Sequence, residues 1–253
     1  MEDLSENVVC DRFSEMGWVN TSAHVPVEKQ ISIFVNCQAL VNILCTPKKL
    51  NFLVIGYLYA EGIISGIDDI ASMRVCDEES EVDVRLRNTE FRVPQARTLT
   101  SGCTGGVAFR TEGEKVESDL VVSPEEVLSL MKQFEEQMEL YRLSGGVHTS
   151  ALSDTQNLLV VAEDIGRHNT LDKILGECLV KGLETRDGLL LCTGRVSSEM
   201  LLKASRIQAP IIVSRTSPTG RAVSLARDLG VTLVGYARGN RLTVYAHPER
   251  LGR

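Results

Sequence analysis

The second half of the chain alternates apolar stretches with helical ones, and this alternation constrains the fold more than any other feature. Strands that are apolar on both faces are typical of parallel sheets covered by helices on both sides. The final stretch, "RLTVYAH", follows its predecessor after a short turn, whereas a parallel crossover needs roughly a dozen residues, so it predicts an antiparallel edge strand. The sequence predicts a three-layer α/β fold whose mostly parallel sheet is built from "NLLVVAED", "GLLLCTG", "APIIVSR" and "VTLVGYA".

Each of these four strands is followed by an arginine. The carboxyl ends of parallel strands meet at one edge of the sheet, where open α/β sheets bind ligands. Three of the turns also open a helix, and free N–H groups at helix starts favour anions. The guanidinium fork matches phosphate oxygens, so the pattern predicts a pocket for a ligand with several phosphates. The arginines of this predicted edge are Arg167, Arg195, Arg215, Arg238 and Arg241.

An alternative for these arginines is a set of surface ion pairs with carboxylates, each contributing only about 0–1 kcal/mol. Two histidines near the same turns also allow two interpretations each. His168, at a predicted helix start beside Asp164, is either an acid–base or phosphate-binding group or a capping or buried, hydrogen-bonded side chain. His148 either lines the same edge or belongs to a turn.

The first part of the chain has a different pattern, with strands around one helix. Residues 31–36 and 40–45 predict paired strands, and residues 81–87 alternate apolar and polar side chains like a half-buried strand. We therefore expect two domains, a smaller strand-rich domain over residues 1–110 and an α/β cofactor-binding domain over residues 111–253.

Two helices have recognisable starts. The apolar stretch 46–64 predicts a helix with Thr46 as its N-cap. Another is predicted after Ser123, because Pro124 suits a first turn and Glu126 completes a capping box. Its apolar stripe, which we expect to face the core, consists of Val127, Leu130, Met131, Phe134 and Met138.

Charge and cysteine usage narrow the class of protein. The net charge of −7 argues against a general nucleic-acid binder. No apolar run approaches the roughly 20 residues of a membrane helix, and no secretory signal is visible at the acidic N-terminus. The seven cysteines are irregularly spaced without a C-x-x-C pair, so we expect no protein-bound metal. Reduced thiols in a cytoplasmic protein are the simplest interpretation.

Cys103 stands apart from the other cysteines because it lies in the glycine-rich segment "TSGCTGG". A thiol that carries a transferable group must be accessible, and its thiolate is favoured near positive charge. Flanking glycines let the backbone approach a partner closely. The alternative is a turn cysteine with no chemical role.

Several longer motifs in the sequence resemble those of one known family. Together they are similar to the formate dehydrogenase accessory sulfurtransferase (FdhD-like) family, over nearly the whole chain and most densely from residue 144 onward. The motifs are "TSGCTGG", "AEDIGRHNTLDKILG", "TGRVSSEMLLKASRI" and "IVSRTSPTGRAVSLARDLGVTLVGYARGNRLTVYAHPERL".

The resemblance implies a function and a fold. Family members take sulfur from a cysteine desulfurase, hold it as a cysteine persulfide, and pass it to the molybdenum (or tungsten) bis-guanine-dinucleotide cofactor of formate dehydrogenase. It also implies a cytidine-deaminase-like three-layer fold and a homodimer. Cys103 matches the persulfide cysteine. The stretch that matches the family's cofactor-binding segment is Tyr236, Ala237, Arg238, Gly239, Asn240 and Arg241.

One departure from the family pattern leaves two functions open. Many members carry C-x-x-C in the loop, whereas this chain has Gly106 at the second position, so a relay between two loop thiols is excluded. Either Cys103 receives and donates sulfur alone, or the protein is a non-catalytic chaperone that binds the cofactor for formate dehydrogenase maturation. A zinc deaminase, suggested only by the implied fold, lacks the required H-x-E and P-C-x-x-C motifs.

Overall fold

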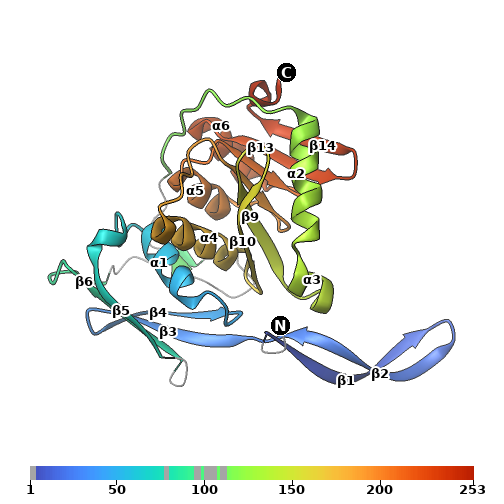
Figure 1. The fold of residues 1–253 in the computed structure, drawn as a ribbon, viewed down its shortest axis with the longest axis horizontal. Helices are drawn as coiled ribbons and strands as arrows, with labels where there is room; N and C mark the ends of the chain where they lie inside the picture. The colour runs from blue at the N-terminus through green and yellow to red at the C-terminus, as the bar shows by residue number, and fades with distance from the viewer. Residues whose placement is uncertain (1–3, 77–79, 94–97, 100–106, 109–112) are drawn as a thin grey trace.

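The computed structural model describes residues 4–76, 80–93, 98–99, 107–108 and 113–253 (Figure 1). A six-stranded sheet occupies the C-terminal part, a four-stranded sheet occupies the N-terminal part, and two hairpins complete the described strands. The helices are α1 (Leu50–Ala60), α2 (Pro124–Glu136), α3 (Glu139–Ser144), α4 (Arg167–Lys181), α5 (Ser198–Arg206) and α6 (Gly220–Leu229), with short 3-10 turns at η2 (Ile67–Asp69) and η3 (Pro248–Leu251).

The six-stranded sheet confirms the predicted strands but adds an unpredicted antiparallel strand between the first two of them. Its strands are β9 (His148–Ser153), β10 (Leu158–Asp164), β11 (Leu189–Cys192), β12 (Ile211–Ser214), β13 (Thr232–Arg238) and β14 (Arg241–Ala246). Their order is β10-β9-β11-β12-β13-β14. Strands β10 to β13 point the same way, because β10 and β11 both pair antiparallel with β9 and the next two ladders are parallel. As predicted, β14 is an antiparallel edge strand. The sheet is therefore mixed, and the prediction of a mostly parallel sheet is wrong at the level of its ladders.

Strand β9 escaped prediction because its buried residues are mostly polar. Thr149, Ser150 and Ser153 are almost fully buried. Each hydroxyl has a partner, since buried polar groups must be hydrogen-bonded: Ser150 Oγ lies 2.7 Å from Thr170 Oγ1, and Ser153 Oγ donates to the Leu189 carbonyl. A strand paired on both sides therefore shows no apolar run.

Helices cover both faces of the six-stranded sheet, so the predicted three-layer arrangement is confirmed (Figure 1). On one face, α4, α5 and α6 pack against sheet residues such as Leu152, Leu190 and Ile212. On the other face lies α2, which begins with the predicted capping box of Ser123 and Glu126. The buried side chains of α2 and its C-terminal flank are the predicted stripe, Val127, Leu130, Met131, Phe134 and Met138.

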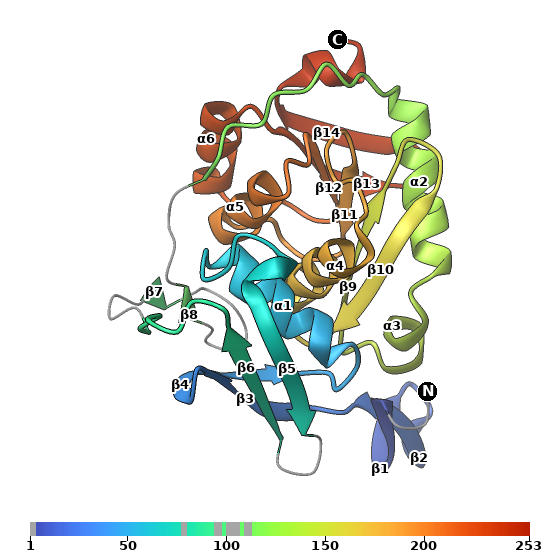
Figure 2. The ribbon, with the colours of Figure 1, turned by 60° about the vertical axis from the view of Figure 1, so that its left-hand side comes forward.

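The four-stranded sheet has the order β4-β3-β6-β5. Its strands are β3 (Lys29–Val35), β4 (Gln38–Cys45), β5 (Ile70–Cys76) and β6 (Glu81–Leu86), and they confirm the predicted pair and the alternating strand. Helix α1 lies between this sheet and α4 (Figure 2). Its sequence is apolar all round rather than amphipathic, as expected for a helix buried on two sides.

The predicted start of α1 is wrong. The helix begins at Leu50, after Lys49 in a left-handed conformation, and Thr46 is not its cap. Thr46 is instead fully buried between the two halves of the chain. Its N–H donates to Asp164 Oδ2 at 3.1 Å, and its carbonyl accepts from Lys173 Nζ at 3.0 Å. Long-range partners have replaced the local cap that the "TP" pair suggested.

A hairpin of β1 (Ser5–Ser14) and β2 (Gly17–Pro26) projects away from the rest of the molecule (Figure 1). The boundary predicted between residues 110 and 111 lies outside the described residues and stays a prediction, as does the likeness to cytidine deaminases. No helix in the described ranges is long and apolar enough to cross a bilayer.

Candidate functional site

A surface pocket of about 400 Å³ lies where β11, β12 and β13 end. Both arginines that line it, Arg215 and Arg238, were predicted from the sequence. None of the lining residues that the structure describes is acidic, so the pocket favours an anion. Its lining residues are Tyr141, Gly145, Gly146, Val147, His148, Thr193, Arg215, Thr216 and Arg238.

One hydrogen bond from a side chain to the backbone links the two arginines. Arg238 Nε donates to the Arg215 carbonyl at 2.8 Å, and the Arg238 guanidinium carbon lies 5.8 Å from the centre of the Tyr236 ring. Arg215 Nε lies 3.2 Å from Glu135 Oε1 of α2, which neutralises part of its charge. Arg238 is exposed and supplies the least compensated cation of the pocket.

Arg167 does not line the pocket, but it lies close to His148, which does. It is the first residue of α4 and is 5% exposed. A Cβ on Gly194 would lie 3.1 Å from His148 Nδ1 and 3.3 Å from the Arg167 Cβ, so Gly194 separates these two side chains at close contact. Burial lowers the pKa of His148, and the Arg167 charge lowers it further while Asp164 opposes it. His148 therefore presents a neutral imidazole near physiological pH.

The remaining predicted residues are outside this pocket. Arg195 and Arg241 are exposed and are not among its lining residues. Ala237 is fully buried in the core beneath α2, so its side chain faces away from the edge. Gly239 and its neighbour Asn240 form the tight turn between β13 and β14, and Gly239 has a left-handed φ of 56°.

His168 belongs to a separate contact. Its Nε2 lies 3.0 Å from Glu199 Oε2 and 3.4 Å from Ser197 Oγ at the start of α5. Burial lowers its pKa, although the hydrogen bond to Glu199 raises it. Of the two interpretations left open, the structure favours the buried, hydrogen-bonded histidine. Asp164 is also buried and pairs with Lys173 at 2.6 Å rather than with His168.

One wall of the pocket, formed by α3 and the glycines after it, was not predicted. Glu163 holds this wall, because its carboxylate accepts from the N–H groups of Leu140 at 2.8 Å and Tyr141 at 2.9 Å. The helix ends at Ser144 and is capped by Gly145, whose φ of 69° is left-handed. The pair "GG" after a short polar helix was the available signal, since glycine commonly terminates helices.

Cys103 lies outside the described residues. The strands on either side of its segment, β7 (Thr98–Leu99) and β8 (Val107–Ala108), pair antiparallel. Among the cysteines that the structure describes, burial raises the pKa of Cys45, Cys178 and Cys192 to about 12. These three are therefore poor nucleophiles, because only a thiolate attacks readily.

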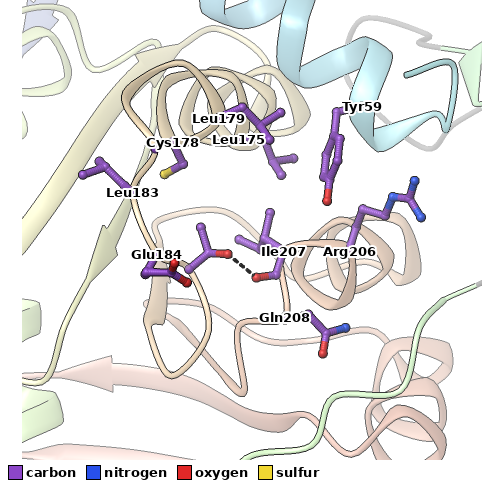
Figure 3. A pocket seen from close by; sticks show the side chains of 11 residues that line it. Tyr59, Leu175, Cys178, Leu179, Leu183, Glu184, Arg206, Ile207 and Gln208 are labelled. Carbon is purple, nitrogen blue, oxygen red and sulfur yellow. Dashed lines mark hydrogen bonds between the residues drawn. The ribbon is translucent and has the colours of Figure 1, made fainter. Parts of the chain in front are cut away.

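A second pocket, of about 290 Å³, lies at the opposite edge of the sheet, between the C-terminal ends of α4 and α5 (Figure 3). Its walls include Leu175, Leu179 and Ile207. The one cation among its described lining residues, Arg206, is paired with Glu114 and lies over the Tyr59 ring, so it is already compensated. In the described ranges, no group of three or more His, Cys, Asp or Glu residues could hold a metal ion.

Comparison with known proteins gives a consistent family. The FdhD/NarQ family model matches residues 26–252. The sulfur carrier protein FdhD of Bacillus subtilis is 36% identical over 88% of this chain and 88% of its own length. That of Staphylococcus aureus strain MRSA252 is 33% identical over 99% of this chain and 97% of its own.

A solved structure agrees with these matches. The crystal structure described as a putative formate dehydrogenase accessory protein, from Desulfotalea psychrophila, superposes with a TM-score of 0.83 at 29% identity. The superposition covers 98% of this chain and 99% of that one. With a family model that spans all but the ends of the sequence, and with relatives above 30% identity along most of it, the chain belongs to the FdhD/NarQ family.

Proposed function

We propose that this protein is a sulfur carrier for formate dehydrogenase maturation. It receives sulfur from a cysteine desulfurase as a persulfide on Cys103 and passes it to the molybdenum (or tungsten) bis-guanine-dinucleotide cofactor, which it binds as a substrate. The names of its relatives, sulfur carrier protein and formate dehydrogenase accessory protein, support this general role.

The observation that carries the cofactor part of the proposal is the pocket with Arg215 and Arg238. A bis-guanine-dinucleotide cofactor carries two diphosphates, and a pocket with two arginines and no acidic residue among its described lining suits such a group. Thr193 and Thr216 add hydroxyls beside the arginines. Because the His148 imidazole is neutral, it can donate or accept a hydrogen bond without repelling either the arginines or the phosphates.

The carrier step exchanges one sulfur between two cysteines. The Cys103 thiolate attacks the outer sulfur of the donor's persulfide, a new S–S bond forms on Cys103, and the donor's S–S bond breaks to release its thiolate. No net oxidation occurs, because one persulfide replaces another. Because Gly106 stands where many family members have a second cysteine, Cys103 both receives and donates the sulfur.

Mass spectrometry tests the carrier role directly. After incubation with a cysteine desulfurase and cysteine, the peptide that contains Cys103 should gain about 32 Da, which a thiol reductant removes. Cys103→Ser should abolish the gain. Cys37→Ser is the matched control, because Cys37 is exposed and receives a hydrogen bond from Arg85, yet has no role in the proposal. In cells, Cys103→Ala should abolish formate dehydrogenase activity.

The chaperone alternative keeps the pocket and dispenses with the thiol. Gly106 favours this alternative, because many family members have a second cysteine at this position and its absence excludes a relay between two thiols. If the desulfurase itself carries a persulfide in the assay and Cys103 gains nothing, the carrier role is wrong. Full formate dehydrogenase activity with Cys103→Ala would then identify a cofactor chaperone.

The proposed partners are a cysteine desulfurase, formate dehydrogenase and the guanine-nucleotide-containing cofactor, in the cytoplasm. The protein is further proposed to act as a homodimer, as the family resemblance implies. Co-purification of the tagged protein with either enzyme from a native extract, retained in Cys103→Ala, tests these partners independently of sulfur transfer.

A further inference from the structure

The hairpin of β1 and β2 exposes an unusual amount of apolar surface. Seven of the fourteen exposed large apolar side chains of the described chain lie within it, including Val9 at 71% and Trp18 at 72% exposure. A two-stranded hairpin alone is marginally stable in water, and its open edges favour pairing with another strand. The projecting position of the hairpin leaves these edges accessible (Figure 1).

The outer edge of β1 is suited to pairing with itself. A two-residue turn joins Ser14 to Gly17, so the bonds from β1 to β2 fall at even-numbered residues and the N–H and C=O groups of residues 7, 9 and 11 point outward. An antiparallel pairing centred on Val9 joins these outward residues of two copies.

The charges of β1 select this register. Centred on Val9, the pairing places Glu6 of each copy opposite Arg12 of the other, and Val8 opposite Cys10. Neither Glu6 nor Arg12 makes a side-chain hydrogen bond or ion pair with another described residue, and both are exposed. If the register between the two β1 strands shifts by one residue pair in either direction, Glu6 and Arg12 both lie opposite uncharged residues. Opposite charges across strands stabilise a sheet, whereas like charges destabilise it.

We propose that two copies of this chain associate through β1, in the register that pairs Glu6 with Arg12, to form a four-stranded antiparallel sheet. The contact is isologous, so one two-fold axis at Val9 closes it and leaves no edge for further growth along β1. The inference rests on the proposed homodimer and names its surface; it does not depend on sulfur transfer.

Charge reversal tests the register. Sedimentation velocity over a range of concentrations should show a dimer of the full-length protein. Glu6→Arg and Arg12→Glu should each weaken the dimer by about ten-fold, because each places two like-charged pairs across the axis. Mixing the two variants should restore association, since opposite charges then face each other at both symmetry-related sites, reversed at one and native at the other. Glu15→Arg, in the turn of the same hairpin but outside the ladder, is the matched control.

Each outcome discriminates. A dimer that none of the variants weakens would overturn the hairpin contact and leave the homodimer and the sulfur carrier standing. A wild-type chain that stays monomeric would overturn the hairpin contact and the homodimer together. Weakening by both single variants without restoration in the mixture would overturn the register. Far-ultraviolet circular dichroism of each variant excludes misfolding as the cause.

Discussion

Gly56 of α1 and Gly176 of α4 face each other where the two helices cross. A Cβ on Gly56 would lie 2.8 Å from the Gly176 nitrogen and 1.8 Å from the Asp172 carbonyl oxygen. A Cβ on Gly176 would lie 2.9 Å from the Gly56 nitrogen and 1.9 Å from the Phe52 carbonyl oxygen. The helices therefore touch through their backbones, and this contact joins the N-terminal sheet to the layer that supports the pocket.

We predict that Gly56→Ala and Gly176→Ala both destabilise the protein. Alanine gains about 1 kcal/mol of helix propensity over glycine, but the added methyl would lie 1.8–1.9 Å from rigid backbone oxygens, so the overpacking cost should be at or above the upper end of the usual range of about 1–3 kcal/mol. The net loss should be at least about 1 kcal/mol, measured as a lower urea midpoint. Gly220→Ala is the control, because no atom beyond its chain neighbours and its own helix backbone lies within 4 Å of the position that its methyl would take, and its φ is not left-handed. Unchanged midpoints in the first two variants would mean that the helices can separate without cost.

Lys203→Met should destabilise the fold in a pH-dependent way. Lys203 Nζ lies 2.5 and 2.6 Å from the two carboxylate oxygens of buried Asp172. Burial raises the pKa of Asp172 to about 6 even with this partner, so removing the lysine raises it further. Leaving a buried charge without its partner costs about 3–5 kcal/mol.

The sign of the pH effect follows from proton linkage. The folded state binds the Asp172 proton more tightly than the unfolded state does. The free energy of unfolding therefore falls as the pH rises from 3.8 to about 6. In Lys203→Met the window extends to higher pH, and the deficit relative to wild type should shrink as the pH is lowered from about 7.5 to about 5. A deficit that is constant over this range, in urea titrations at each pH, would contradict the assignment.

His168 should make the opposite contribution. Burial lowers the pKa of His168 below 6.5, so near this pH the unfolded state binds a proton more readily than the folded state does. Stability is therefore lost as the pH falls below about 6.5. His168→Gln removes this term, and its melting temperature should fall less than that of wild type between about pH 7.5 and about pH 5.5. His24→Gln, at an exposed position on β2, controls for the general loss of an imidazole. Equal slopes for His168→Gln and wild type would refute the prediction.

Local chemistry made part of this structure predictable from sequence. The capping box of Ser123 and Glu126 and the apolar strands β11 and β12 depend on residues close in the chain, and the structure confirms them. Thr46 looked like a cap for the same local reason, yet Asp164, 118 residues away, binds its N–H. No pattern within one segment carries that information.

The candidate site was also predictable only where it depends on residues close in the chain. That Arg215 and Arg238 share a pocket follows from the common direction of β12 and β13, which the alternation of strands and helices implies. That Arg195 is outside the pocket depends on the path of the turn after β11, which no local signal determines. Glu163 lies near the end of the predicted strand "NLLVVAED", but the N–H groups of α3 that it binds come from a helix that the sequence did not predict.

Arg238→Ala should weaken nucleotide binding more than any other single change at this edge. Its guanidinium is exposed, is oriented by the Arg215 carbonyl and lies in the pocket, whereas Arg215 shares its charge with Glu135. Losing a charge-assisted hydrogen bond costs about 1.5–3 kcal/mol, so the dissociation constant for guanosine diphosphate should rise by at least about ten-fold in calorimetric titrations. Arg195→Ala should have a smaller effect, because Arg195 does not line the pocket. Arg186→Ala, at an exposed site before β11 and hence at the other edge of the sheet, is the matched control. Equal affinities for Arg238→Ala and Arg186→Ala would place the diphosphates elsewhere, because the loss of a general surface cation would then explain both.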